Sequence, residues 1–112
     1  MKEFVLLFRA DWDSFRDASP EVAQARTQKW VDWIGDIAAK GKLVSGGNRL
    51  HNHGKLVKAS KITDGPFVEA KESVGGYSII KANSYEEAVE LSKTCPVLAG
   101  GGVVEVREIH PM

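Results

Sequence analysis

The sequence lacks the features on which several classes of protein depend. Its one cysteine, Cys95, can neither form an internal disulfide nor complete a zinc site of four thiolates, which favours a reducing compartment and a cytoplasmic protein. Fifteen basic side chains balance fifteen acidic ones, so the basic excess typical of proteins that bind nucleic acid or anionic membranes is missing. No apolar run in the sequence approaches the length that spans a bilayer.

Signals for cofactor binding are also missing. The glycine run at residues 100–102 is not followed by lysine and a hydroxyl residue, and it precedes a predicted strand, unlike a phosphate-binding loop. No segment has the spacing of a nicotinamide or flavin fingerprint. We therefore predict no cofactor, and neither nucleic acid nor a membrane as a partner.

The residues that are present fit a single globular domain over residues 1–112. The chain is 43% hydrophobic and 27% charged, an ordinary balance for a folded protein. The patterns predict strands at 2–9, 43–50, 55–62, 77–82 and 103–109, and helices at 20–40 and 85–94. This order predicts an α+β ferredoxin-like sandwich, in which an antiparallel sheet carries both helices on one face.

Both predicted helices have start signals. Ser19 and Pro20 suit the N-cap and the first position of the first helix, and Ser84 with Glu87 has the pattern of a capping box at the second. In the first helix an apolar stripe recurs at three- and four-residue steps, and it consists of Trp30, Trp33, Ile34, Ile37 and Ala38. We expect this stripe to pack on the sheet.

Between the helices the chain has several turn signals. Gly46 and Gly47 interrupt the strand at 43–50 and indicate a bulge or a close approach of two backbones. Residues 52–54 have turn chemistry, and residues 55–62 alternate like one strand of an exposed ribbon. Residues 63–66 are predicted to form the next turn, and residues 67–73 an extended segment.

The first strand predicts a second subunit. Residues 4–8 are apolar at every position, which is typical of a central strand covered on both faces. Two helices cover only one face of a sheet, and we expect Ser78, Ile80 and Val103 to add to the uncovered side. Because a monomer rarely leaves a large apolar face in water, we predict a homodimer, packed sheet against sheet, with a cleft between the subunits.

The most distinctive stretch runs from Asp64 to Glu72, with the sequence DGPFVEAKE. Asp64 suits a turn cap, and in an extended chain Glu69 and Lys71 project on one side with Phe67. A Glu–Lys pair beside a dimer cleft could hold a small acid or move a proton, so we predict Asp64, Glu69 and Lys71 as catalytic residues. The predicted substrate contacts are Trp12, His51, Phe67 and Glu72. The alternative is a solvated charge run over a structural turn.

Two further groups of residues contain side chains that can bind metals or act as nucleophiles. His51 and His53 share one side of an extended segment, but no third ligand is assured, so we predict no metal site. Cys95 has no histidine near it in sequence and follows a helix C-terminus, which favours a structural role over a nucleophile.

The stretch at 64–72, followed by Gly75 and Gly76, resembles the signature of the DGPF branch of the YCII-related family. The resemblance covers nearly the whole chain, including residues 4–8, 46–47, 87–88, 95–96, 100–102 and 105–107. It implies a dimeric α+β barrel and no particular reaction. Some shorter members, among them dehydrochlorinase-like enzymes, carry a His–Asp pair in the dimer cleft, where this chain has Val22 and Cys95. Neither residue can replace that acid–base pair.

Two functional classes are therefore open. The first is an enzyme that acts on a small molecule without a cofactor, with a pocket at or near the dimer cleft. The second is a non-catalytic binding or accessory module, in which the 64–72 stretch only stabilises the sheet and the dimer. Convergence of the predicted side chains in a concave, partly buried pocket would favour the enzyme.

Overall fold

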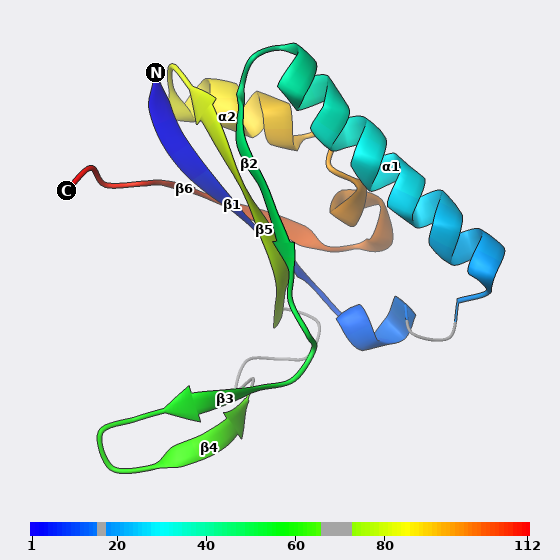
Figure 1. The fold of residues 1–112 in the computed structure, drawn as a ribbon, viewed down its shortest axis with the longest axis vertical. Helices are drawn as coiled ribbons and strands as arrows, with labels where there is room; N and C mark the ends of the chain where they lie inside the picture. Colours follow the sequence, from blue (N-terminus) through cyan, green and yellow to red (C-terminus); the bar gives the residue numbers. More distant parts are fainter. Residues whose placement is uncertain (16–17, 66–72) are drawn as a thin grey trace.

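A computed structural model describes residues 1–15, 18–65 and 73–112. Figure 1 shows a sheet with both helices on one side, and a separate ribbon that projects beyond one end. The strands are β1 (Lys2–Ala10), β2 (Leu43–Arg49), β3 (Gly54–Val57), β4 (Ile62–Gly65), β5 (Ser73–Ala82) and β6 (Val103–Glu108). The helices are α1 (Pro20–Ala39) and α2 (Tyr85–Ser92), with short 3-10 helices η1 (Trp12–Phe15) and η3 (Pro96–Gly100).

The sheet has the strand order β2-β5-β1-β6, and every neighbouring pair is antiparallel. Leaving the ribbon aside, this is the strand order of a ferredoxin-like α+β fold, which confirms the predicted fold class. Strand β1 lies centrally between β5 and β6, as its unbroken apolar sequence predicts.

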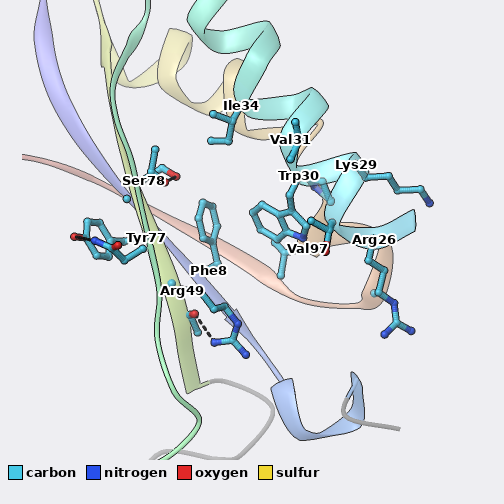
Figure 2. A pocket seen from close by; sticks show the side chains of 18 of the residues that line it. Phe8, Arg26, Lys29, Trp30, Val31, Ile34, Arg49, Tyr77, Ser78 and Val97 are labelled. Atoms are coloured by element: carbon cyan, nitrogen blue, oxygen red, sulfur yellow. Dashed lines mark hydrogen bonds between the residues drawn. The ribbon is translucent and has the colours of Figure 1, made fainter. Parts of the chain in front are cut away.

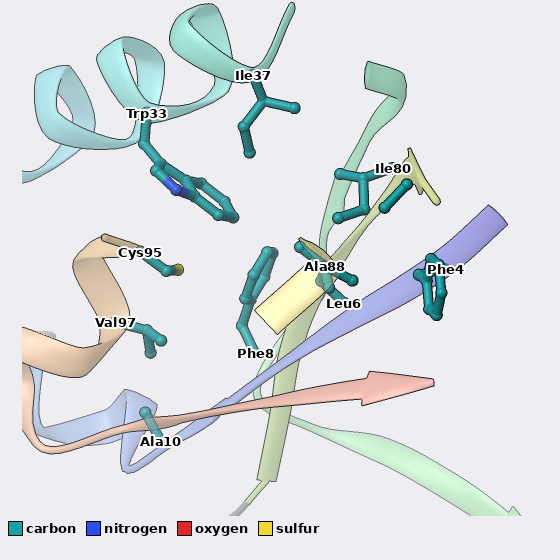
Figure 3. Close-up of a cluster of buried hydrophobic side chains, with 11 residues drawn as sticks. Phe4, Leu6, Phe8, Ala10, Trp33, Ile37, Ile80, Ala88, Cys95 and Val97 are labelled. Atoms are coloured by element: carbon teal, nitrogen blue, oxygen red, sulfur yellow. The ribbon is translucent and has the colours of Figure 1, made fainter. Parts of the chain in front are cut away.

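The core lies between the sheet and the helices. Alternate residues of β1 point toward the helices and are almost completely buried, namely Phe4, Leu6, Phe8 and Ala10. Trp33 and Ile37 of α1 and Ala88 of α2 close the cluster from the other side (Figure 3). The Trp33 indole donates its Nε1–H to the carbonyl oxygen of Leu91 at 3.1 Å, which ties α1 to the end of α2 and satisfies the buried nitrogen.

Helix α1 begins as predicted, since the Ser19 hydroxyl accepts a hydrogen bond from the Val22 amide. The predicted stripe is confirmed at Trp33 and Ile37, which are buried, and at Trp30 and Ile34, which pack against the core. It is wrong at Ala38, which is exposed because it lies one residue, about 100°, round the helix from Ile37. Among the described residues, no helix combines the length and the apolar composition needed to cross a bilayer.

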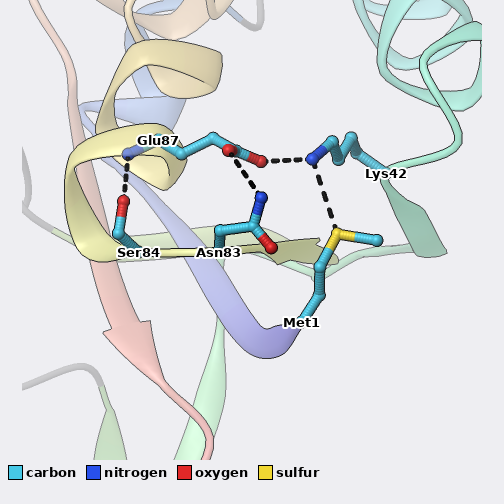
Figure 4. A network of polar contacts seen from close by, with 5 residues as sticks. All are labelled: Met1, Lys42, Asn83, Ser84 and Glu87. Atoms are coloured by element: carbon cyan, nitrogen blue, oxygen red, sulfur yellow. Dashed lines mark hydrogen bonds and ion pairs between the residues drawn. The ribbon is translucent and has the colours of Figure 1, made fainter.

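Helix α2 begins with half of a capping box. The Ser84 hydroxyl accepts from the Glu87 amide at 3.2 Å, as predicted. The Glu87 carboxylate instead accepts hydrogen bonds from Lys42 Nζ and from the Asn83 side-chain amide (Figure 4). Because Lys42 directly precedes β2, this contact fastens the start of α2 to the edge of the sheet.

The expectation for Ser78 and Ile80 was wrong. Residues directly opposite each other in an antiparallel pair share a face, and Ile80 lies opposite Phe4 while Ser78 lies opposite Leu6. Both are therefore buried beneath the helices. Val103, in contrast, lies opposite Arg9 and is 53% exposed, away from the helices.

The outer face of the sheet carries a different apolar set. Its centre consists of two directly opposed pairs from β1 and β5, which are Val5 with Ile79 and Leu7 with Tyr77. All four side chains are partly exposed, and both helices lie on the other side of the sheet (Figure 1).

The ribbon corrects another prediction. Residues 55–62 do not form one strand, because the chain turns back at Lys58–Lys61, where the amide of each lysine donates to the carbonyl oxygen of the other. Residues Thr63 to Gly65 belong to β4 and do not form a turn. The ribbon is exposed, as predicted, with Val57 and Ile62 paired across it and 76% and 67% exposed.

Candidate small-molecule site

An open cavity of about 1010 Å³ lies between α1 and the helix-facing side of the sheet (Figure 2). Phe8, Gly46 and Ser78 line it from the sheet, and Trp30 and Ile34 line it from α1. Small-molecule sites typically enclose about 300–1,000 Å³, so this cavity has room for a metabolite. The cavity lies on the face of the sheet that the helices cover. The dimer cleft was expected on the other, outer face.

The cavity exists because neither wall fills this space with large apolar side chains. From residue 23 to residue 29, α1 has no large apolar side chain that could reach the sheet. Opposite, the sheet presents Gly46, Gly76 and Ser78. A Cβ atom placed on Gly46 would come no closer than 4.0 Å to Ile34 Cγ2, so the space above this glycine is unfilled.

The glycine pair in β2 also shapes this edge of the sheet. Gly47 has φ +74°, and a Cβ atom there would lie 1.6 Å from the Tyr77 carbonyl oxygen. The register of β2 against β5 shifts between Ser45 and Asn48, which confirms the predicted bulge and close approach.

Aromatic rings form the inner wall of the cavity. Phe8 meets Trp30 edge to face, with ring centroids 4.8 Å apart and planes 70° apart. Trp33 supports both rings from the core, with centroids 5.8 Å from Phe8 and 5.9 Å from Trp30. Such a packed cluster gives a fixed apolar surface for a ligand.

Trp12 forms the end of the cavity and is held by β5. Its Nε1–H donates to the Ser73 carbonyl oxygen at 2.9 Å. The indole lies directly over Gly75, where an added Cβ atom would be 2.1 Å from Trp12 Cε2. The predicted substrate contact Trp12 therefore lines the cavity.

Arg49 stacks on Trp12 and supplies a charge to the same end. Its guanidinium carbon lies 4.5 Å from the centroid of the Trp12 ring. It also donates to the carbonyl oxygen of Gly75 at 2.5 Å and to Asn52 Oδ1 at 3.0 Å. Partial burial lowers the pKa of Arg49, because leaving water penalises its charged form, but a guanidinium remains protonated at neutral pH.

Of the other predicted site residues, the two that the structure describes do not line this cavity. His51 is exposed and does not line it. Asp64 lies on the ribbon, where its side chain is 84% exposed and paired with Lys55. Phe67, Glu69, Lys71 and Glu72 lie outside the described residues, so their roles stay predictions. Arg49 and Trp30 were not predicted as site residues. The sequence signal for this site was the pairs of glycines at 46–47 and 75–76, which line the cavity.

The described residues contain no group of three or more histidine, cysteine, aspartate or glutamate side chains that could hold a metal ion. His53 is exposed, like His51. Cys95 is 3% exposed, and burial raises the pKa of its thiol to about 12. The predicted burial of Cys95 is therefore confirmed, and a thiol with this pKa is not ionised at neutral pH.

Comparison with known families now adds an independent observation. The model of the YCII-related domain matches residues 3–112. The chain belongs to the YCII-related family. Membership in its DGPF branch stays a prediction, since the match is to the family as a whole.

One solved structure similar to this YCII-related chain is 5-chloro-2-hydroxyhydroquinone dehydrochlorinase from Burkholderia phenoliruptrix AC1100, in complex with 2,5-dihydroxybenzoquinone. The two share 20% sequence identity, and the match covers 97% of this chain and 95% of the other, with a TM-score of 0.43. No curated protein matches the chain in sequence.

Proposed function

We propose that this YCII-related domain binds a small molecule in the cavity between α1 and the sheet. The observation that carries the proposal is the size of the cavity together with its lining. Aromatic and aliphatic side chains form most of the described wall, and a few polar groups, such as Arg49 and Ser78, are placed among them. This combination is typical of sites that bind metabolites.

A thermal-shift screen of small metabolites on the wild type and on Gly46→Leu tests this proposal. A leucine side chain at this position fills the space above Gly46 without backbone strain, since Gly46 does not have a positive φ. We expect compounds that raise the Tm of the wild type and leave the Tm of Gly46→Leu unchanged. Equal shifts in both proteins, or no shift with any compound, would contradict the proposal.

We also propose that the domain acts on this molecule as a cofactor-independent enzyme. The described part of the lining contains no carboxylate, imidazole or thiol, so an acid or base must come from elsewhere in the chain. The 64–72 stretch supports this, because Ser73 follows it directly and accepts the hydrogen bond from Trp12 in the cavity wall. In this proposal Glu69 and Lys71 transfer protons, and Phe67 and Glu72 contact the substrate.

Lys71→Met separates catalysis from binding alone. A compound selected by the screen is incubated with the wild type and with Lys71→Met, and the products are followed by mass spectrometry. If the domain is an enzyme, we expect turnover by the wild type and a rate of turnover about a hundredfold lower in the variant. Binding without turnover in the wild type would favour the non-catalytic module instead.

We propose, in addition, that two copies of the chain pack through the outer face of the sheet. The apolar pairs Val5–Ile79 and Leu7–Tyr77 support this, because no described helix covers them. A cytoplasmic location is supported by the single cysteine, which is free and buried.

A further inference from the structure

Arg49 forms no ion pair with a described residue, and the Asp13 carboxylate is linked to it only through the side-chain amide of Asn52. Its Nη1 donates to the carbonyl oxygens of Leu50 and Gly75, and its Nη2 donates to Asn52 Oδ1. All three acceptors are uncharged, and none of the ion pairs within the described part of the chain includes Arg49. The guanidinium is therefore fixed in position without being paired to an anion.

The unused donors of Arg49 have a defined arrangement. A guanidinium has five N–H groups, and these contacts occupy both hydrogens of Nη1 and one of Nη2. The Nε–H and one Nη2–H are left, and the nitrogens that carry them, Nε and Nη2, lie on one edge of the group. This pair is the fork that binds both oxygens of a carboxylate.

The surroundings of Arg49 favour a negative ligand. Arg26 and Lys29 line the same cavity, and the described lining contains no aspartate or glutamate. A cavity with positive groups and apolar walls attracts anions, since the low-dielectric walls reduce the screening of its charges. The guanidinium carbon lies 4.5 Å from the centroid of the Trp12 ring, and this contact adds to the hydrogen bonds that hold the group in place.

We propose that the ligand of the cavity is a small organic acid with a flat apolar body. Its carboxylate is bound by the free edge of Arg49, and its body lies against the rings of Phe8 and Trp30 (Figure 2). This inference rests on the proposed function, because it names the class of molecule that the same cavity binds.

A pair of isosteric probes tests the inference. The affinities of 2-naphthoate and of the neutral 2-naphthamide are measured by isothermal titration calorimetry. We expect the wild type to bind 2-naphthoate about 10- to 100-fold more tightly, which is the range for hydrogen bonds between charged groups. Arg49→Met should abolish this preference and keep the affinity for 2-naphthamide, because the methionine stem still covers Trp12.

Two more variants control the test. Arg49→Lys keeps the charge without the fork, and we expect it to lose most of the preference. Lys40→Met removes an exposed charge at the far end of α1 and should retain the full preference, which excludes an effect of net charge alone. If thermal denaturation shows that Arg49→Met does not fold, Arg49→Lys decides the outcome.

The possible failures are distinguishable. If the wild type binds both probes equally, the inference about the acid is wrong and the cavity remains a binding site. If the wild type binds neither probe although compounds of the screen raise its Tm, the inference alone is wrong, whereas a screen without any shift contradicts the proposed function. An undiminished preference for 2-naphthoate in folded Arg49→Met or in Arg49→Lys would assign the anion to another group and overturn the inference.

Discussion

At the residue scale, Gly75 makes room for Trp12 and, through Trp12, for Arg49. A Cβ atom at Gly75 would lie 2.1 Å from Trp12 Cε2, so Gly75→Ala must displace the indole from its hydrogen bond to Ser73. We expect Gly75→Ala to lower the free energy of unfolding by roughly 1–3 kcal/mol, the usual cost of overpacking. Urea denaturation measures this change, and near-UV circular dichroism reports the altered tryptophan environment.

Gly35 provides the matched control for this substitution. It lies inside α1, and a Cβ atom there would meet no atom within 4 Å. Gly35→Ala should therefore raise the free energy of unfolding by about 1 kcal/mol, because alanine favours a helix more than glycine does. If both alanine variants change stability in the same direction, the close contact between Gly75 and Trp12 does not determine the position of the indole.

The site residues differ in how far the sequence reveals them. Trp12 could be predicted, because an aromatic ring in a polar connection needs something to cover it. Arg49 could not, because an arginine at the end of a strand is normally solvated, and only the fold brings it onto Trp12. Trp30 was predicted to belong to the core, and it does pack against the core. It also lines the cavity, because residues 23–29 of α1 include no large apolar side chain that would cover its ring.

At the scale of elements, the contact between Lys42 and Glu87 predicts a dependence of stability on pH. The hydrogen bond from Lys42 lowers the pKa of Glu87 in the folded protein. A carboxylate with a depressed folded pKa stabilises the fold above its unfolded pKa, and this contribution is lost as the pH falls through the folded value. Urea midpoints of the wild type should therefore decrease as the pH is lowered through the carboxylate range.

Glu87→Gln tests the origin of that decrease. We expect the variant to be less stable than the wild type at pH 7 and to approach it in acid, so that the two pH profiles converge. Glu86→Gln changes a neighbouring exposed glutamate and should run parallel to the wild type. A constant difference between Glu87→Gln and the wild type at every pH would show that the ionised pair is not responsible.

The elements themselves could be predicted to different degrees. Caps and apolar stripes are local, so both helices and the four strands of the main sheet follow from the sequence. The ribbon did not, because Lys58–Lys61 contains none of the glycine, asparagine or proline residues that usually mark a hairpin turn. The alternation of polar and apolar residues continues through such a turn unchanged. One long strand and two short strands joined by the turn therefore have the same sequence pattern.

At the scale of the whole molecule, the two faces of the sheet are proposed to have separate roles. The outer face is proposed to form the dimer, so Leu7→Lys should give monomers in sedimentation velocity experiments while the wild type sediments as a dimer. Val89→Lys, which changes an exposed apolar residue of α2, should remain dimeric. A wild type that stays monomeric at micromolar concentration would contradict the dimer.

The assignment of the two faces was only partly accessible from sequence. Apolar residues on both sides of β1 indicate that both faces are covered, but alternation alone does not say which side the helices take. That choice reversed the expected positions of Ser78 and Ile80. It also places the cavity within one chain, on the side away from the proposed dimer.

The central claim is that the ligand binds between α1 and the sheet of a single chain. A crystal structure of the wild type soaked with 2-naphthoate tests it most directly. We expect electron density for the ring beside Phe8 and Trp30, with the carboxylate at Arg49. Density between the outer faces of two chains, or a cavity without density when the probe is bound in solution, would contradict it.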